Sequence, residues 1–229
     1  MSYSVMVISA KEKSKVIESI VTAVQSKYDA CHETLREIAN KAKTGGEKRQ
    51  ATGDFVEQIL QTIIDTIAKS IPEANLVSKR GSQDSLSMTL NYKGGKIVLN
   101  KIQVDRHLWA RNKRIAFVEN KTYLDACYLD RALADFKKIA MALEQEGTNP
   151  NSVKYIVFAG QDAVSESKVL AYEALFNEET KGLTIEGLKP HIFYFLQEKR
   201  RSSKELSVTK FLIDVGSVER FSEFIINLL

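Results

Sequence analysis

Three charged side chains in this sequence have the types and spacing needed to hold a metal ion beside an activated water. They are Asp105, Glu119 and Lys121, and the last two close an apolar run that begins at Ile115. Successive side chains of a strand point to opposite faces, so Glu119 and Lys121 would share one face. Polar residues 111–114 predict a hairpin turn that folds Asp105 back beside Glu119. One hairpin would therefore supply two carboxylates and an ammonium.

This set of groups suits phosphodiester hydrolysis. Paired carboxylates at a strand end favour Mg²⁺, which binds a few carboxylates and keeps several waters. A neighbouring lysine can orient or deprotonate a water that attacks phosphorus, while the metal stabilises charge on the phosphate oxygens. The alternative interpretation is that Asp105 caps a turn while Glu119 and Lys121 form a solvated ion pair, because acid-x-lysine triplets are common by chance.

Two segments in a particular order carry a resemblance to a known family. They are Val104-Asp105 and Phe117-Val118-Glu119-Asn120-Lys121, the second just before a predicted helix. This arrangement resembles the PD-(D/E)xK nuclease superfamily, most of all its type II restriction endonucleases. The resemblance covers residues 54–160, and Val104 stands where the pattern has proline.

The resemblance implies a role for each matching residue. Asp105 and Glu119 would be metal ligands, with the backbone carbonyl of Asn120 as a further ligand, and Lys121 would position the attacking water. Many members also carry an acid on the preceding helix, and Glu57 matches it. The alternative for Glu57 is a capping box with Asp54 at a helix start.

An alternative first acid and several basic residues lie near this hairpin. Asp84 falls in a polar loop, too far along the chain from Glu119 to share one hairpin with it. Arginine and lysine can bind phosphates or guanine, and asparagine can address adenine. The candidate DNA-binding residues are Lys79, Arg80, Arg106, His107, Arg111, Asn112, Lys113 and Arg114, and the alternative for each is a solvated side chain. A net charge of +4 permits an anionic partner without requiring one.

The length and composition predict one globular domain over residues 1–229, which are 44% hydrophobic and 27% charged. Helical spacing predicts a long N-terminal helix within residues 1–43 and another helix from Asp54 to Pro72. Between them, residues 44–53 predict a mobile loop. This loop lacks the Gly-Lys-Ser/Thr ending of a phosphate-binding loop, so no nucleotide cofactor is expected.

Alternation and apolar runs predict the strands. Three antiparallel strands are expected between residues 86 and 121, then a helix over 122–146, a buried strand over 155–159 and a helix over 165–178. An elaboration over residues 190–229 would add strands at 191–196 and 208–213 and a closing helix at 217–229. The pattern predicts an α/β fold with a mixed central sheet flanked by helices, the three-layer core of restriction endonucleases.

No signal peptide or membrane-spanning apolar run is present in the sequence, so we expect a soluble cytoplasmic protein. Cys31 and Cys127 lie far apart in helical patterns, which favours reduced, buried thiols over a disulfide or a zinc site.

Together with these observations, the resemblance implies a Mg²⁺-dependent type II restriction endonuclease that cuts double-stranded DNA at a short palindromic site. Symmetric cutting calls for a homodimer. Its interface would use the N-terminal helix or the C-terminal helix with Phe221, Phe224, Ile225 and Leu228, unless these side chains are buried within one chain. The alternatives are a structure-specific or repair nuclease of the same fold, and a non-catalytic DNA-binding protein.

Overall fold

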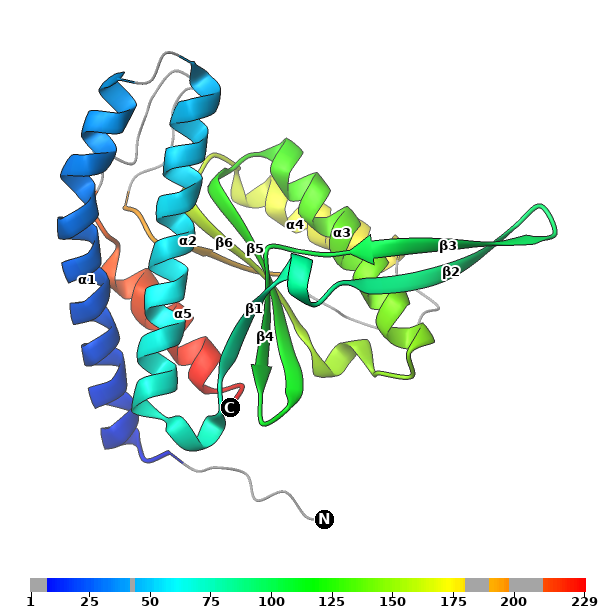
Figure 1. Ribbon diagram of the computed structural model, residues 1–229, viewed down its shortest axis with the longest axis horizontal. Helices are drawn as coiled ribbons and strands as arrows, with labels where there is room; N and C mark the ends of the chain where they lie inside the picture. Colours follow the sequence, from blue (N-terminus) through cyan, green and yellow to red (C-terminus); the bar gives the residue numbers. More distant parts are fainter. Residues whose placement is uncertain (1–7, 42–43, 180–189, 198–211) are drawn as a thin grey trace.

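The computed structural model describes residues 8–41, 44–179, 190–197 and 212–229. Its centre is a five-stranded mixed sheet in the order β1-β4-β5-β6-β7 (Figure 1). The strands are β1 (Val77–Arg80), β4 (Arg106–Ala110), β5 (Lys113–Leu124), β6 (Lys154–Asp162) and β7 (His191–Tyr194). The middle strand, β5, pairs antiparallel with β4 and parallel with β6. The predicted mixed sheet with a central acid-x-lysine strand is confirmed.

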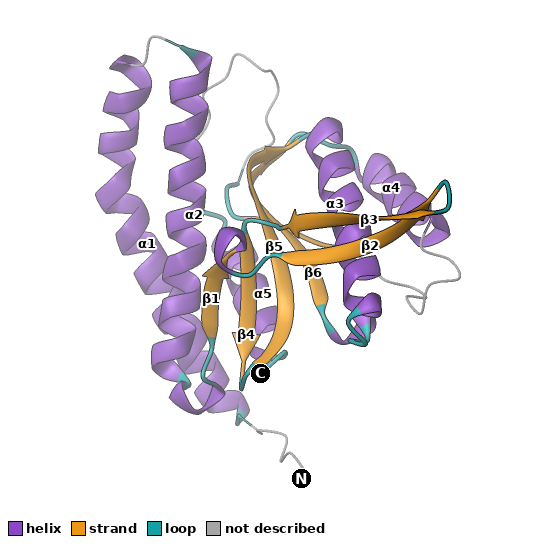
Figure 2. Ribbon diagram, turned by 45° about the vertical axis from the view of Figure 1, so that its right-hand side comes forward, coloured by secondary structure: helices purple, strands orange, loops and turns teal. Residues whose placement is uncertain are grey.

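Helices cover both faces of this sheet (Figure 2). One layer holds α1 (Ala10–Lys41), α2 (Gly45–Ser70) and α5 (Val215–Ile226), and the other holds α3 (Ala126–Gln145) and α4 (Glu166–Glu179). Neighbouring residues of β5 serve different layers, because side chains alternate along a strand. Val118 packs in the core under α2, and Phe117 packs in the core under α3. The three-layer α/β fold is therefore established.

The hairpin of β2 (Leu86–Tyr92) and β3 (Gly95–Ile102) forms a separate two-stranded sheet. The expectation of three consecutive antiparallel strands is therefore wrong in part, because β3 does not pair with β4. Instead β4 pairs with β1, which the sequence pattern did not indicate. The burial of β1 gives no clean alternation over its four residues, and such a short strand leaves little periodic signal.

The predicted loop over residues 44–53 is wrong, because α2 begins at Gly45. A capping box starts this helix: the Thr44 hydroxyl accepts from the backbone amide of Glu47 at 3.2 Å, and the Glu47 side chain accepts from the Thr44 amide at 3.4 Å. Glu57 therefore lies inside α2 and does not cap a helix start with Asp54. The described residues also form three short 3₁₀ helices: η1 (Pro72–Ala74), η2 (Gly81–Gln83) and η3 (Pro150–Ser152).

The remaining predicted elements are present with shifted bounds. Residues 122–124 extend β5, and α3 begins only after Asp125, whose side chain accepts from the Tyr128 amide at 2.9 Å. Of the predicted strand over 208–213, residues 208–211 lie outside the described residues, while Ile213 forms an isolated bridge with Leu196. Phe221 and Ile225 of α5 are fully buried in the core under α2, which favours burial within one chain over an interface.

Both cysteines are free thiols on helices, but the expectation of burial is wrong: Cys31 is half-buried and Cys127 is exposed. Over the described ranges, none of the helices combines the length and apolar character needed to cross a membrane.

Candidate functional site

The β4–β5 hairpin brings the two predicted acids together. Arg106 pairs with Val118, which places Asp105 opposite Glu119 at the open end of the hairpin. The backbone amide of Asp105 donates to Glu119 Oε2 at 3.4 Å, and the backbone amide of Asn120 donates to Asp105 Oδ2 at 2.7 Å. The structure therefore has the acid pair that the turn position predicted.

Lys121 bridges the two acids. Its Nζ lies 2.5 Å from Glu119 Oε1 and 3.9 Å from Asp105 Oδ2. The Lys121 and Glu119 side chains are 16% and 11% exposed, so this is not the solvated ion pair of the alternative interpretation. Asp105 is 45% exposed and gives the group an open side.

The surroundings of the acid pair raise the pKa of both carboxyls. Burial raises the pKa of Glu119, and the nearby Asp105 carboxylate raises it further, against the opposing effect of Lys121. Burial also raises the pKa of Asp105, although Lys121 and the Asn120 amide oppose the change. Two carboxylates that resist full ionisation side by side fit a divalent cation, whose charge would offset their repulsion.

A cleft of about 690 Å³ lies beside the acid pair. Its wall comes from α2, from the turn after β1 and from the segment before β4. The lining residues are Gln50, Gly53, Asp54, Glu57, Arg80, Gly81, Ser82, Gln103, Val104, Asp105, Glu119 and Asn120. Gln50, Gly53, Ser82 and Gln103 were not among the candidates, and the wrong loop assignment hid the first two. The carboxylates therefore face an open, mostly polar space.

Glu57 lies in the cleft wall but is held by arginines. Its carboxylate accepts a hydrogen bond from Arg106, whose side chain is 9% exposed, and lies 3.6 Å from Arg80 Nε. The side chain therefore does not point freely at the acid pair. Among the described residues, no group of three histidine, cysteine or acidic side chains is arranged to hold a metal. A Mg²⁺ ion often takes only one or two carboxylates plus waters, so Asp105 and Glu119 fit that pattern.

Asn120 has an unusual environment within the cleft wall. Its Oδ1 and Nδ2 are buried and have no hydrogen-bond partner among the described residues. Its side chain projects from the opposite face of β5 to Glu119 and Lys121. The role of its backbone carbonyl as a metal ligand stays a prediction.

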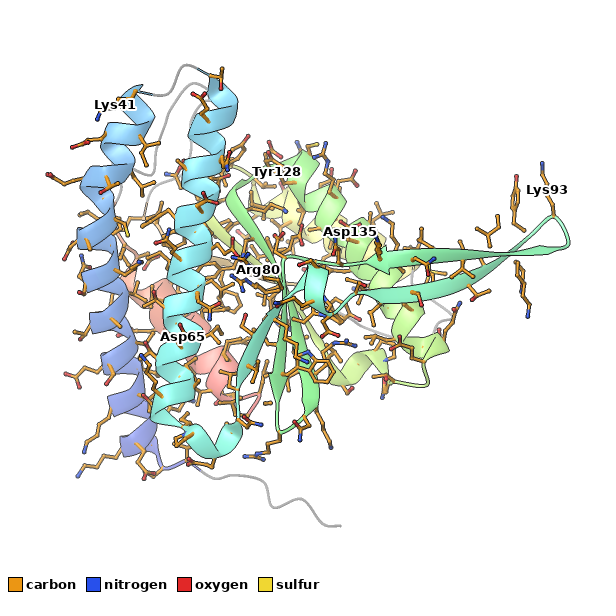
Figure 3. All side chains as sticks on the ribbon, viewed as in Figure 1. Lys41, Asp65, Arg80, Lys93, Tyr128 and Asp135 are labelled. Carbon is orange, nitrogen blue, oxygen red and sulfur yellow. The ribbon has the colours of Figure 1, made fainter. Side chains whose placement is uncertain are left out.

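Some predicted DNA-binding residues reach the cleft and others do not. Arg80 is exposed and lines the cleft beside α2 (Figure 3). Lys79 is exposed, with its Nζ 4.6 Å from the centre of the Trp109 ring. Arg106 points into the cleft wall toward Glu57 and is almost fully buried. Of these three residues, Arg80 is therefore the one with exposed surface at the cleft, while Lys79 lies beside Trp109.

His107 and Arg114 belong to a separate buried cluster around Asp84. Asp84 Oδ2 lies 3.1 Å from His107 Nδ1 and accepts from Trp109 Nε1 at 2.6 Å, while Oδ1 accepts from Arg114 at 3.0 Å. His107 is fully buried, so the expectation of a solvated turn side chain is wrong and DNA has no access to it. Asp84 is bound here, in agreement with its exclusion as the first acid.

The pKa of Asp84 shifts in the opposite direction to the pKa values of Asp105 and Glu119. Burial raises the pKa of Asp84, but Arg114, Trp109 and His107 outweigh burial, so its pKa is lowered overall. Burial is the main cause that lowers the pKa of His107 to about 4, so this imidazole is neutral at pH 7. Asp84 thus has the partners that the acid pair lacks.

Arg111, Asn112 and Lys113 lie at the closed end of the β4–β5 hairpin. Arg111 and Asn112 have φ values of 48° and 62°, as a two-residue type I′ turn requires. Five strand residues, about 17 Å, separate this turn from Asp105. The structure therefore does not bring these three residues to the cleft.

Gly81 is a site residue without a side chain. Its amide donates to the Asp105 carbonyl at 3.2 Å, and a Cβ at this position would lie 1.8 Å from the Val104 carbonyl oxygen. This close approach holds the turn after β1 against the segment that carries Asp105. The sequence offers no local signal for it beyond the glycine itself.

A comparison with models of known protein families finds no match, and a comparison with curated protein sequences finds none either. The resemblance to PD-(D/E)xK nucleases therefore rests on the sequence motifs alone and stays a prediction.

Proposed function

We propose that this chain is a Mg²⁺-dependent endodeoxyribonuclease of the type II restriction class, which acts as a homodimer on a short palindromic site in double-stranded DNA. One observation carries the proposal: Asp105, Glu119 and Lys121 converge beside a cleft at the end of the middle strand. Burial and mutual repulsion raise the pKa of both carboxyls, and the charge of a bound cation would offset this repulsion.

Asp105 and Glu119 would hold the ion, and Lys121 would act on the attacking water. Bound Mg²⁺ supplies positive charge that stabilises the phosphate oxygens as the phosphodiester is cut. The Lys121 ammonium now neutralises both acids, so an ion on the carboxylates would free its protons for a hydrogen bond to water. Held within reach of the phosphorus, that water would form the new P–O bond as the ester P–O bond breaks.

Glu57 would take part only after a change of partner. Its carboxylate is engaged by Arg106 and lies near Arg80, and both arginines can bind a phosphate instead. A phosphate that enters the cleft would compete with Glu57 for these arginines and leave its carboxylate free to turn toward the acid pair.

A second candidate is a structure-specific or repair nuclease with the same catalytic residues. It is favoured by the position of Arg111, Asn112 and Lys113, which lie too far from the cleft to read bases of DNA bound there. A non-catalytic DNA-binding protein is a third candidate, for which Asp105→Ala would leave function intact.

Incubation of the protein with unmethylated viral DNA and Mg²⁺ tests these candidates on a gel. We expect discrete fragments from wild type and from Lys138→Ala, which changes an exposed lysine on α3. We expect no fragments from Glu119→Ala, from Lys121→Ala or without metal, with rates lowered about a hundredfold or more. A smear would favour the repair nuclease. Intact DNA with all variants alike, under several metals and salts, would refute catalysis at this site.

A further inference from the structure

The β2–β3 hairpin, here called the arm, extends away from the body of the protein and ends at Lys93 (Figure 3). It pairs with none of the other described strands. Its inner part is fastened to the end of α3: the Thr89 amide donates to Gln145 Oε1 at 2.8 Å, and Gln145 Nε2 donates to the Thr89 carbonyl at 2.9 Å. A lone two-stranded hairpin is only marginally stable in water, so the part beyond Thr89 needs a covering layer.

One face of the arm is apolar along its whole length. Residues directly opposite each other in an antiparallel pair share a face, and the pairs Met88–Leu99 and Leu90–Ile97 follow each other on this one. At the base, Leu86, Met88 and Ile102 are buried in the core under α3. Farther out, the exposed fractions are 37% for Leu90, 58% for Tyr92, 51% for Ile97 and 38% for Leu99. The apolar face therefore continues from the core into solvent.

The opposite face of the arm carries the polar and charged groups. Thr89 pairs there with Val98, and Asn91 pairs with Lys96. Residues 86–102 contain three lysines and no acidic residue. None of the lysines occupies a position on the apolar face between Leu86 and Leu99. At the tip of the arm the Lys93 ammonium lies 5.2 Å from the centre of the Tyr92 ring. A second apolar face can therefore cover Leu90, Ile97 and Leu99 without burying a charge, and the same face of another copy fulfils that condition.

We propose that two copies of this chain associate through the apolar faces of their arms, packed against each other around a two-fold axis. The interface would be formed by Leu90, Tyr92, Ile97 and Leu99 of each copy. Identical faces that match each other suit an isologous dimer. The aromatic and aliphatic side chains of α5, the earlier candidate for an interface, are used inside one chain.

The expected dimer is modest in strength. Four partly exposed side chains per copy form a small interface, so we expect a dissociation constant on the order of micromolar. Association itself needs no catalysis. Its consequence, that one complex carries two acid pairs and cuts both strands, rests on the proposed function.

Sedimentation equilibrium of the full chain, without DNA or metal, tests the proposal with a matched pair of variants. Ile97 and Val98 are neighbours on β3 with exposed fractions of 51% and 54%, but they lie on opposite faces. We expect wild type and Val98→Glu to form dimers with similar constants. We expect Ile97→Glu to dissociate at least tenfold more readily, because it places a carboxylate in the apolar contact.

A monomeric wild type would overturn the proposal, as would equal loss of dimer in both variants. If wild type is monomeric and Ile97→Glu lowers its melting temperature, the covering layer comes from the same chain. If wild type is monomeric and Ile97→Glu weakens DNA binding, DNA covers this face. A monomer that still cuts DNA would refute the dimer and support the nuclease proposal. A dimer that depends on the arm but does not cut DNA would support the dimer and refute the nuclease proposal.

Discussion

The β4–β5 hairpin supports two charged clusters that differ in how their acids are satisfied. Asp84 receives hydrogen bonds from Trp109 and Arg114, contacts His107, and has a lowered pKa. The acid pair of Asp105 and Glu119 shares one lysine, and the pKa of each carboxyl is raised. The first cluster fastens the turn before β2 onto the sheet. In the second cluster, burial and repulsion between the two carboxylates disfavour their ionised forms in the folded protein.

Under the proposed function, this contrast separates an acid that stabilises the fold from a pair of acids that binds a cation. An ionised acid with enough donors stabilises the fold, whereas a crowded pair destabilises it until a cation arrives. Substitutions in the two clusters should therefore change stability in opposite directions.

The largest effect is expected from Asp84→Ala. Removal of this carboxylate leaves Arg114 and Trp109 buried without their acceptor, so the free energy of unfolding should fall by about 3–5 kcal/mol. Urea unfolding followed by fluorescence measures it, with Asp135→Ala on the surface of α3 as a control. A loss below about 1 kcal/mol would remove the distinction between the clusters.

A smaller effect is expected from pH. The pKa of His107 is about 4 in the folded protein and 6.5 in its ordinary state. Between these values the unfolded chain binds more protons, so stability contributed by neutral His107 is present above pH 6.5 and is lost as pH falls toward 4. The gap corresponds to roughly 3 kcal/mol at most. The difference in unfolding free energy between wild type and His107→Gln, measured from pH 7 to pH 4, should shrink accordingly, and a constant difference would contradict the assignment.

The smallest effect is expected from Glu119→Gln, with the opposite sign. The raised pKa means that the ionised carboxyl is disfavoured in the folded protein, so a neutral isostere should stabilise the metal-free protein by up to about 1 kcal/mol. Mg²⁺ should raise the melting temperature of wild type and leave that of the variant unchanged. Calorimetry with and without Mg²⁺ measures both effects. A destabilised variant would mean that the acid pair is a structural feature like Asp84.

The sequence predicts the acid pair well because the positions of both acids depend on residues close to them in the chain. A strand period of two and a turn at Arg111 and Asn112 suffice to place Asp105 beside Glu119, and the geometry follows them. The order of apolar segments likewise predicts the mixed sheet and its helices. Helix starts are less certain: two glycines directly follow Thr44, and they favour a loop assignment where Thr44 and Glu47 in fact form a capping box.

The Asp84 cluster was beyond sequence reasoning because its partners come from distant segments. His107, Trp109 and Arg114 lie 23 to 30 positions after Asp84 in the chain. The residues around each of them predict only a polar or amphipathic turn. Burial of a charged group depends on long-range packing, which periodicity does not record. The same reason explains why the sequence predicts a DNA contact for Arg106, which instead donates a hydrogen bond to Glu57.

Gly81 gives a practical warning for any mutational scan of this protein. Every replacement would push a Cβ against the Val104 carbonyl and disturb the backbone that carries Asp105, so activity should be lost at a position that contributes no functional group. A scan scored by cleavage alone would rank Gly81 with Glu119 and Lys121. Measuring the amount of folded protein as well as cleavage would separate the glycine that shapes the site from the side chains proposed to act in it.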